Sequence, residues 1–128
     1  MKGRGKMSKE FEFIQECGYF YVITINGDFP AARPFGAMME VDGDLFIGTH
    51  DRNEVHKQLR ENSNIQILAK KEQSREWLRI TGIASECNDH ELKQRFIDES
   101  PALARHHKSA DSEHYLMFRI KVIKSEFH

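Results

Sequence analysis

The chain has 128 residues, of which 30% are charged and 39% hydrophobic, and this is enough for one domain with a buried core. Its formal net charge of −1 argues against a general nucleic-acid binder, although a local phosphate pocket remains compatible with it. No apolar run has the length of a membrane-spanning helix. The cysteines, Cys17 and Cys87, fit no metal-binding spacing, and they indicate free thiols in a reducing compartment such as the cytoplasm.

The first ten residues are basic and are followed by no long apolar segment, so they do not form a secretory signal. We expect residues 1–10 to be a flexible N-terminal segment, with either Met1 or Met7 as the start. We expect a single domain over residues 11–128.

The chain begins with a predicted short helix and a hairpin turn. Ser8 is a favourable N-cap, and Gly18 suits the end of the same helix. Residues 19–25 are aromatic and β-branched, which predicts a strand. The Asn-Gly-Asp sequence at 26–28 then predicts a tight turn.

The segment that returns from this turn contains Pro30 and Pro34. Proline cannot donate a hydrogen bond to a sheet, so we expect an edge strand, or one that pairs fully only after Pro34. Residues 37–41 can continue this strand. The Asp-Gly pair at 42–43 predicts a second tight turn, and residues 45–49 predict the next strand.

The rest of the chain mixes helical and strand patterns. Asn53 is expected to cap a helix that runs to about Asn62, and Asn88 opens a capping-box pattern for a second helix. Pro101 suits the first position of another short helix. The apolar parity of the last strand switches at Ile123, which predicts a bulge or a strong bend. The strands expected here cover residues 64–69, 77–85 and 115–127.

These elements define the expected fold class. The count is about six strands, mostly joined by short turns, which favours an antiparallel sheet. A six-stranded antiparallel sheet with one buried face tends to close into a barrel, because closure removes exposed edges. We therefore expect a mainly β (α+β) protein, a six-stranded antiparallel barrel with short peripheral helices.

Three segments carry a recognisable pattern in a fixed order: residues 27–37, residues 45–49 with 54–62, and residues 77–84. Together they resemble the FMN-binding split-barrel superfamily of the pyridoxamine 5'-phosphate oxidase type, and most closely its short bacterial branch of nitroimidazole-resistance-like and general-stress-like proteins. The resemblance implies a split barrel, a homodimer, and an FMN held in a groove built by both subunits.

The phosphate of FMN would need cations and free backbone N–H groups. The resemblance places Arg33 on the strand that lines the cofactor and makes Thr49 a second contact point. The stretch from Thr49 to Asn53 would supply a strand end, a loop and a helix N-terminus. Arg52 and Lys57 are further candidate cations, with ordinary surface charge as the alternative for both.

The flavin ring would need backbone hydrogen bonds and apolar cover. Pro34 and Phe35 can present backbone groups, and Gly36 would permit close approach of a ligand. Trp77, the only tryptophan, is either a contact to the ring edge or a core anchor. His50 could touch the flavin or a substrate, and an ordinary loop residue is the alternative.

Two departures from the oxidase pattern matter. The oxidases carry a lysine six residues after the position of Thr49, and this chain has Val55 there. They also carry a C-terminal tryptophan and an Arg–His substrate clamp, whereas no tryptophan follows Trp77 here, so vitamin B6 oxidation is not expected. No metal site is assigned, because the adjacent His106 and His107 are a poor chelating pair and indicate a solvated turn.

The leading hypothesis is an FMN-dependent oxidoreductase acting on a small molecule, with no catalytic acid or base that can be named. The first alternative is a non-enzymatic flavin-binding or stress-related redox protein. The second is a split-barrel protein that binds another ligand, such as haem or a deazaflavin. Fold alone does not choose between these functions.

Overall fold

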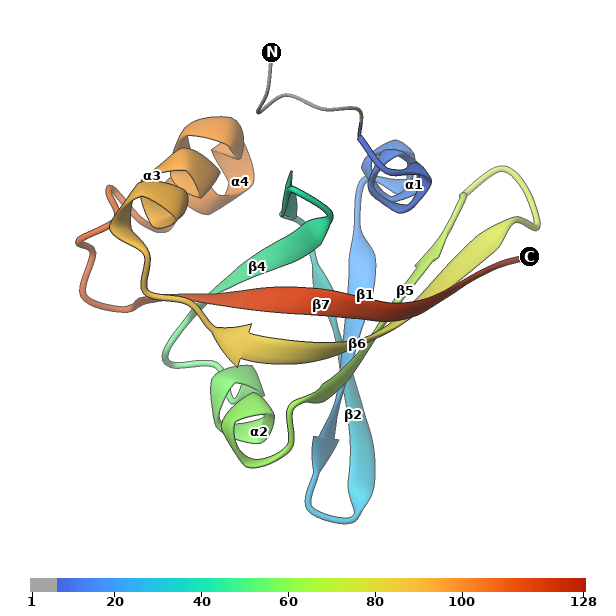
Figure 1. Ribbon diagram of the computed structural model, residues 1–128, viewed down its shortest axis with the longest axis horizontal. Coiled ribbons are helices and arrows are strands. Elements are labelled where there is room, and N and C mark those ends of the chain that lie inside the picture. Colours follow the sequence, from blue (N-terminus) through green and yellow to red (C-terminus); the bar gives the residue numbers. More distant parts are fainter. Residues whose placement is uncertain (1–6) are drawn as a thin grey trace.

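The computed structural model describes residues 7–128 as a strongly curled antiparallel sheet with four short helices around it (Figure 1). The helices are α1 (Lys9–Cys17), α2 (Val55–Glu61), α3 (His90–Glu99) and α4 (Pro101–Ala104). The strands are β1 (Phe20–Asn26), β2 (Phe29–Phe35), β3 (Met39–Val41), β4 (Asp44–His50), β5 (Asn64–Lys70), β6 (Trp77–Glu86) and β7 (Tyr115–Phe127). Their order in the sheet is β2-β1-β5-β6-β7-β4-β3.

A short link between the two edge strands forces the sheet to curl. β2 and β3 lie at opposite edges, yet only residues 36–38 separate them in the chain. Seven flat strands would place their edges roughly 29 Å apart. The four steps from Phe35 to Met39 can span only roughly 14 Å. The sheet therefore bends into a barrel that stays open between β2 and β3, which confirms the expected split-barrel architecture.

The strand count differs from the sequence prediction. The described residues contain seven strands, because residues 37–41 do not continue β2 as predicted. The chain leaves the sheet after Phe35 and re-enters it as β3 against β4. β2 is an edge strand, as predicted, but it pairs with β1 along its whole length. This pairing is compatible with the two prolines, Pro30 and Pro34. They are an even number of residues apart, so their backbone nitrogens lie on the same side of β2, and that side faces away from β1.

The bulge predicted in the last strand is present. Thr81 pairs with Lys124 while Gly82 pairs with Val122, so Ile123 has no opposite residue on β6. A Cβ atom at Gly82 would lie 2.7 Å from the carbonyl oxygen of Lys121 and 2.8 Å from a methyl carbon of Ile120. The close crossing of β6 and β7 at this bulge therefore requires a glycine.

Two apolar clusters lie on opposite faces of the sheet around β4. Leu45 and Ile47 belong to the barrel core, together with residues such as Ile67 and Ile80. Phe46 points to the other face, where it belongs to a second cluster that β3, β7, α3 and α4 complete. β4 is thus buried on both faces, and its carboxyl end has a fixed position.

No helix in the described part of the chain is long and apolar enough to cross a membrane.

The helix boundaries correct three further predictions. Ser8 caps α1 as expected, but Lys9 and Glu10 are helical, so the flexible segment predicted over residues 1–10 is wrong for these two. Residues 1–6 lie outside the described residues. α2 begins only at Val55, and Glu54 rather than Asn53 occupies the N-cap position, without a side-chain cap bond. Asp89, one residue after the predicted cap, accepts the capping hydrogen bond of α3.

Cys17 and Cys87 are free thiols, as predicted.

We predict that Gly82→Ala lowers the free energy of unfolding by about 2–3 kcal/mol, because the added methyl group would meet backbone that cannot move aside. Urea denaturation followed by circular dichroism measures this change. Gly36→Ala is the matched control, since a Cβ at Gly36 meets nothing within 4 Å and should change stability by at most about 1 kcal/mol. Equal stabilities of the two variants would contradict the role assigned to the bulge.

Candidate functional site

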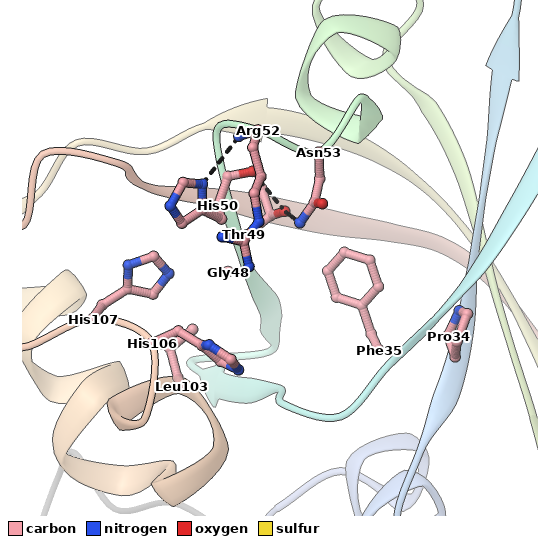
Figure 2. Close-up of a pocket in the computed structure, with 10 residues that line it drawn as sticks. All are labelled: Pro34, Phe35, Gly48, Thr49, His50, Arg52, Asn53, Leu103, His106 and His107. Atoms are coloured by element: carbon pink, nitrogen blue, oxygen red, sulfur yellow. Dashed lines mark hydrogen bonds between the residues drawn. The ribbon is translucent and has the colours of Figure 1, made fainter.

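A groove runs between the end of β2 and the end of β4. It consists of two adjoining pockets of about 350 and 190 Å³, and both are lined by Pro34, Phe35, Thr49 and Asn53. Arg33 lines the larger pocket only. Figure 2 shows the smaller pocket, with Phe35 on one side and the residues around His107 on the other. The groove therefore brings together two segments that the sequence analysis assigned to one cofactor site.

Arg33 is the best-defined cation of this groove. Its Nη1 atom donates to the carbonyl oxygens of Val22 and Ala31, both at 3.2 Å, and to Oγ1 of Thr24 at 2.8 Å. Its Nη2 atom donates to Oε1 of Gln58 at 2.6 Å. All four acceptors are neutral, and among the described residues no carboxylate forms an ion pair with this guanidinium. Burial lowers the pKa of Arg33 from its usual value, but an arginine remains charged at neutral pH.

Pro34 and Phe35 give the groove an apolar wall. The ring of Phe35 packs against the barrel core and lies 6.1 Å from the ring of Phe20, centroid to centroid. Gly36 follows them, but it is not among the residues that line either pocket. No neighbour in the chain requires a glycine there, since a Cβ at Gly36 would meet open space.

Thr49 and Asn53 form the opposite wall. Thr49 is 5% exposed, and its Oγ1 accepts a hydrogen bond from the side-chain amide of Asn53 at 3.3 Å. This bond, rather than a cap on α2, is the role of Asn53 in the fold. The loop is further held by His56, whose buried ring Nδ1–H donates to the Asn53 carbonyl at 2.6 Å. The wall is therefore preorganised by its own hydrogen bonds.

The remaining predicted cations differ in position. Arg52 is exposed and lines the smaller pocket, where its guanidinium has no hydrogen-bond or ion-pair partner among residues 7–128. Lys57 lines neither pocket, and its side chain is 63% exposed and 3.5 Å from the carboxylate of Glu54. In this chain Lys57 is surface charge, the alternative considered above. Val55 is 2% exposed, belongs to the barrel core and also lines the larger pocket, so the pocket has an apolar side chain at that position.

Trp77 does not belong to the groove of its own chain. It begins β6, and its indole stacks on the ring of His128 at 4.2 Å between centroids. Backbone hydrogen bonds join the same two residues, and the Arg79 guanidinium lies 5.2 Å from the indole. Trp77 is only partly buried, so it is not a core anchor either. A contact between Trp77 and a ligand in the groove would require a second copy of the chain.

The structure adds a histidine-rich wall that the sequence reasoning did not assign to the site. His50 is the last residue of β4, one residue beyond the predicted strand end, and lines the smaller pocket together with His106 and His107. His107 is 4% exposed, so the solvated turn predicted for this pair is wrong for His107. Its ring stacks on Tyr115 at 4.8 Å between centroids. Burial, and secondarily the neighbouring His50, lowers the pKa of His107 below its usual value.

No sequence signal identified this wall, because its parts are far apart in the chain. Gly48 permits the contact, since a Cβ there would lie 2.9 Å from a methyl carbon of Leu103. α4 therefore packs directly on β4, and this packing places His106 and His107 beside His50. The Gly-to-Leu contact spans more than fifty residues and follows from no local pattern.

We predict that protein stability falls as the pH drops below about 6.5, in part because of His107. Its folded pKa is lowered, so in this range the unfolded chain takes up a proton that the folded chain does not. His107→Gln should reduce the loss of melting temperature between pH 7 and pH 5.5. His106→Gln removes an exposed neighbour and should keep the wild-type slope. Identical pH slopes for wild type and His107→Gln would contradict the burial of a neutral imidazole.

The comparisons with known proteins agree with this fold. The sequence profile described as pyridoxamine 5'-phosphate oxidase matches residues 8–128, so the chain belongs to the pyridoxamine 5'-phosphate oxidase family. No curated protein matches the chain. The family assignment confirms the resemblance found in the sequence and the split-barrel class of the fold.

Several solved structures share the fold. A NimC/NimA family protein from Clostridium acetobutylicum is 28% identical, with a TM-score of 0.82 over 93% of this chain and 89% of that one. A FAD-binding protein from Mesorhizobium loti is 15% identical, with a TM-score of 0.64 over 99% and 97%. The haem storage protein HutZ from Vibrio cholerae is 16% identical, with a TM-score of 0.70 over 94% and 91%.

Proposed function

We propose that this protein binds FMN in the groove between β2 and β4, that two copies of the chain complete the site, and that the flavin serves an oxidoreductase reaction on a small molecule. The observation that carries the proposal is the charge of Arg33 at the groove wall. This guanidinium is held by four neutral acceptors and has no acidic partner in the described chain. A partly buried positive charge without a counterion is costly, and an anionic ligand offsets that cost.

The phosphate of FMN is an anion of suitable chemistry for this position. Arg33 has Nε–H and part of Nη2 left to donate, since its four hydrogen bonds come from Nη1 and Nη2. Arg52 adds a second cation, which is exposed and lines the smaller pocket together with Thr49 and Asn53. Charge-assisted hydrogen bonds from arginine to phosphate are about twice as strong as neutral ones. The helix dipole of α2 adds little, because α2 has only 7 residues.

The flavin ring would lie along the apolar wall formed by Pro34 and Phe35. The pockets of one chain, about 350 and 190 Å³, expose their contents to solvent on the remaining side. Ligand sites usually bury most of the ligand surface, so one chain offers only part of an FMN site. A second copy would supply the missing cover, and this is the only way in which Trp77 could reach the ring edge. We therefore propose a homodimer.

Bound FMN supplies transfer of one or two electrons, and the protein binds and orients the ring. The described chain contributes backbone at Pro34 and Phe35, and the side chains of His50 and His107 near the pocket where a small molecule would enter. Enzymatic turnover and passive flavin binding are distinguished by adding a reduced nicotinamide and an electron acceptor. Steady oxidation of the nicotinamide supports an oxidoreductase, whereas stable binding without oxidation supports a non-enzymatic redox protein.

We predict that Arg33→Ala weakens FMN binding at least tenfold, about 1.4 kcal/mol, and weakens riboflavin binding much less, because riboflavin lacks the phosphate. Quenching of flavin fluorescence during titration measures both affinities. Arg33→Lys keeps the charge and should retain part of the preference for FMN. Lys57→Ala is the matched control, since this exposed cation lines neither pocket and its loss should change neither affinity.

Each result of this titration has a separate meaning. Equal loss of FMN and riboflavin in Arg33→Ala would contradict the phosphate contact, while flavin binding itself would stand. Arg33 also joins β2 to Thr24 and Gln58, so the melting temperature of each variant is measured first. Absence of any spectral change in FMN with the folded wild-type protein would contradict the proposed function.

We also predict that the protein sediments as a dimer and binds one FMN per chain. A groove that one chain covers only in part leaves apolar surface exposed, and self-association of two chains would cover it. Analytical ultracentrifugation at micromolar concentration, with and without FMN, measures the stoichiometry. A monomer that still binds FMN tightly would contradict the shared groove.

Haem is a second candidate ligand, because three histidines line the smaller pocket and imidazole is a common axial ligand of haem iron. Two similar structures are described as a haem storage and a haem-binding protein. The absorption spectrum of the purified protein distinguishes the candidates, since flavin gives two broad bands and haem gives a single intense Soret band.

A further inference from the structure

Three side chains converge at the point where β4 ends and β7 begins. They are His50, Asp51 and His114, and one ligand atom of each lies within 4.8 Å of the others. Asp51 is at the centre: its carboxylate oxygens lie 3.0 and 3.1 Å from Nδ1 of His114, and 3.4 Å from Nδ1 of His50. The two imidazole rings stack on one another with centroids 5.0 Å apart.

The backbone fixes this arrangement before any ligand binds. β4 and β7 are paired up to His50 and Tyr115, so His114 is the next residue beyond the last pair. The backbone N–H of Asp51 then donates to the carbonyl oxygen of His114 at 3.0 Å. The three side chains thus start from neighbouring positions at the ends of two paired strands and do not depend on a long loop for their proximity.

Two imidazoles and one carboxylate are ligands that suit Zn²⁺ and similar divalent transition metals better than Mg²⁺ or Ca²⁺. A tetrahedral Zn²⁺ with bonds of about 2.0–2.1 Å holds neighbouring ligand atoms roughly 3.4 Å apart. The observed separations of 3.0 and 3.4 Å around Asp51 are close to this value. The stacked rings would have to rotate to aim both nitrogens at one ion, and His114 has room to do so because its side chain is 54% exposed.

His50 is already in a compatible protonation state. Its Nδ1 accepts the backbone N–H of Arg52 at 3.0 Å, so this nitrogen carries a lone pair and no proton. For the same reason the 3.4 Å approach to Asp51 is not an ion pair in this state. A metal bound at Nδ1 would take the place of the Arg52 N–H.

We propose that His50, Asp51 and His114 form a three-ligand site for a divalent transition metal ion of the Zn²⁺ type. Three protein ligands leave at least one coordination position open. His50 also lines the smaller pocket, so the ion would lie at the rim of that pocket, where its open position could bind an anionic group of a small molecule. The inference does not depend on flavin binding and can be tested without it.

The chain provides a matched control for a simple surface ion pair. His90 and Asp111 form an exposed pair, with Nε2 and Oδ1 3.2 Å apart, and within residues 7–128 no third ligand joins them. If exposed His–Asp pairs alone attract metal, His90→Ala should lower affinity as much as His114→Ala. If a three-ligand site is required, only His114→Ala should do so.

The experiment is a Co²⁺ titration of untagged protein, first treated with a chelator and kept free of flavin, followed by visible absorption spectroscopy and by displacement with Zn²⁺. We expect one Co²⁺ per chain with visible ligand-field bands that Zn²⁺ removes. His114→Ala and Asp51→Asn should each weaken binding at least tenfold, and His90→Ala should leave it unchanged. Melting temperatures confirm that each variant is folded, which is expected because the side chains of His114, Asp51 and His90 are 54%, 40% and 63% exposed.

Wild-type protein without ligand-field bands at millimolar Co²⁺ would overturn the site. An equal loss of affinity in His90→Ala and His114→Ala would overturn it as well, since binding would then be a property of exposed ion pairs. Neither result bears on FMN, which is assayed separately by the riboflavin comparison.

Discussion

The short connection between β2 and β3 is the constraint on which the rest of the structure depends. Three residues join strands at opposite edges of a seven-stranded sheet, so the sheet can satisfy its hydrogen bonds only by curling. Curling brings the end of β2, with Arg33 and Phe35, opposite the end of β4, with Thr49. The groove therefore forms because the sheet curls almost into a closed barrel. It lies beside the remaining gap between the two edge strands.

β4 connects this constraint to the chemistry of the site. Its alternate side chains enter both apolar clusters, so it is held from two faces, and it ends in the polar residues that line the groove. The contact between Gly48 and Leu103 fixes α4 against the same strand. One strand thus supports the wall formed by Thr49 and Asn53, the histidine-rich wall and the His50–Asp51–His114 cluster. Rigid strands hold such sites more accurately than loops do.

Several residues that the sequence analysis assigned to a cofactor site lie together in one groove. Arg33, Pro34, Phe35 and Thr49 line the groove, because the curl of the sheet brings the end of β2 opposite the end of β4. Lys57 does not, because α2 starts at Val55 and turns this lysine toward solvent. Asn53 lines the groove but bonds to Thr49 instead of capping a helix. Trp77 lies elsewhere in its own chain, where it stacks on His128.

By itself, the sequence determined what depends on neighbours in the chain: the turns, the alternation of strand faces, the edge character of β2 and the bulge at Ile123. Its ordered segments also identified the family. Only the tertiary structure decided that β3 is a separate strand, that His107 is buried, and that His114 lies beside Asp51, although 63 positions separate them. The physical reason is that strand pairing and helix docking join residues remote in the chain, and their geometry depends on how the whole sheet curls.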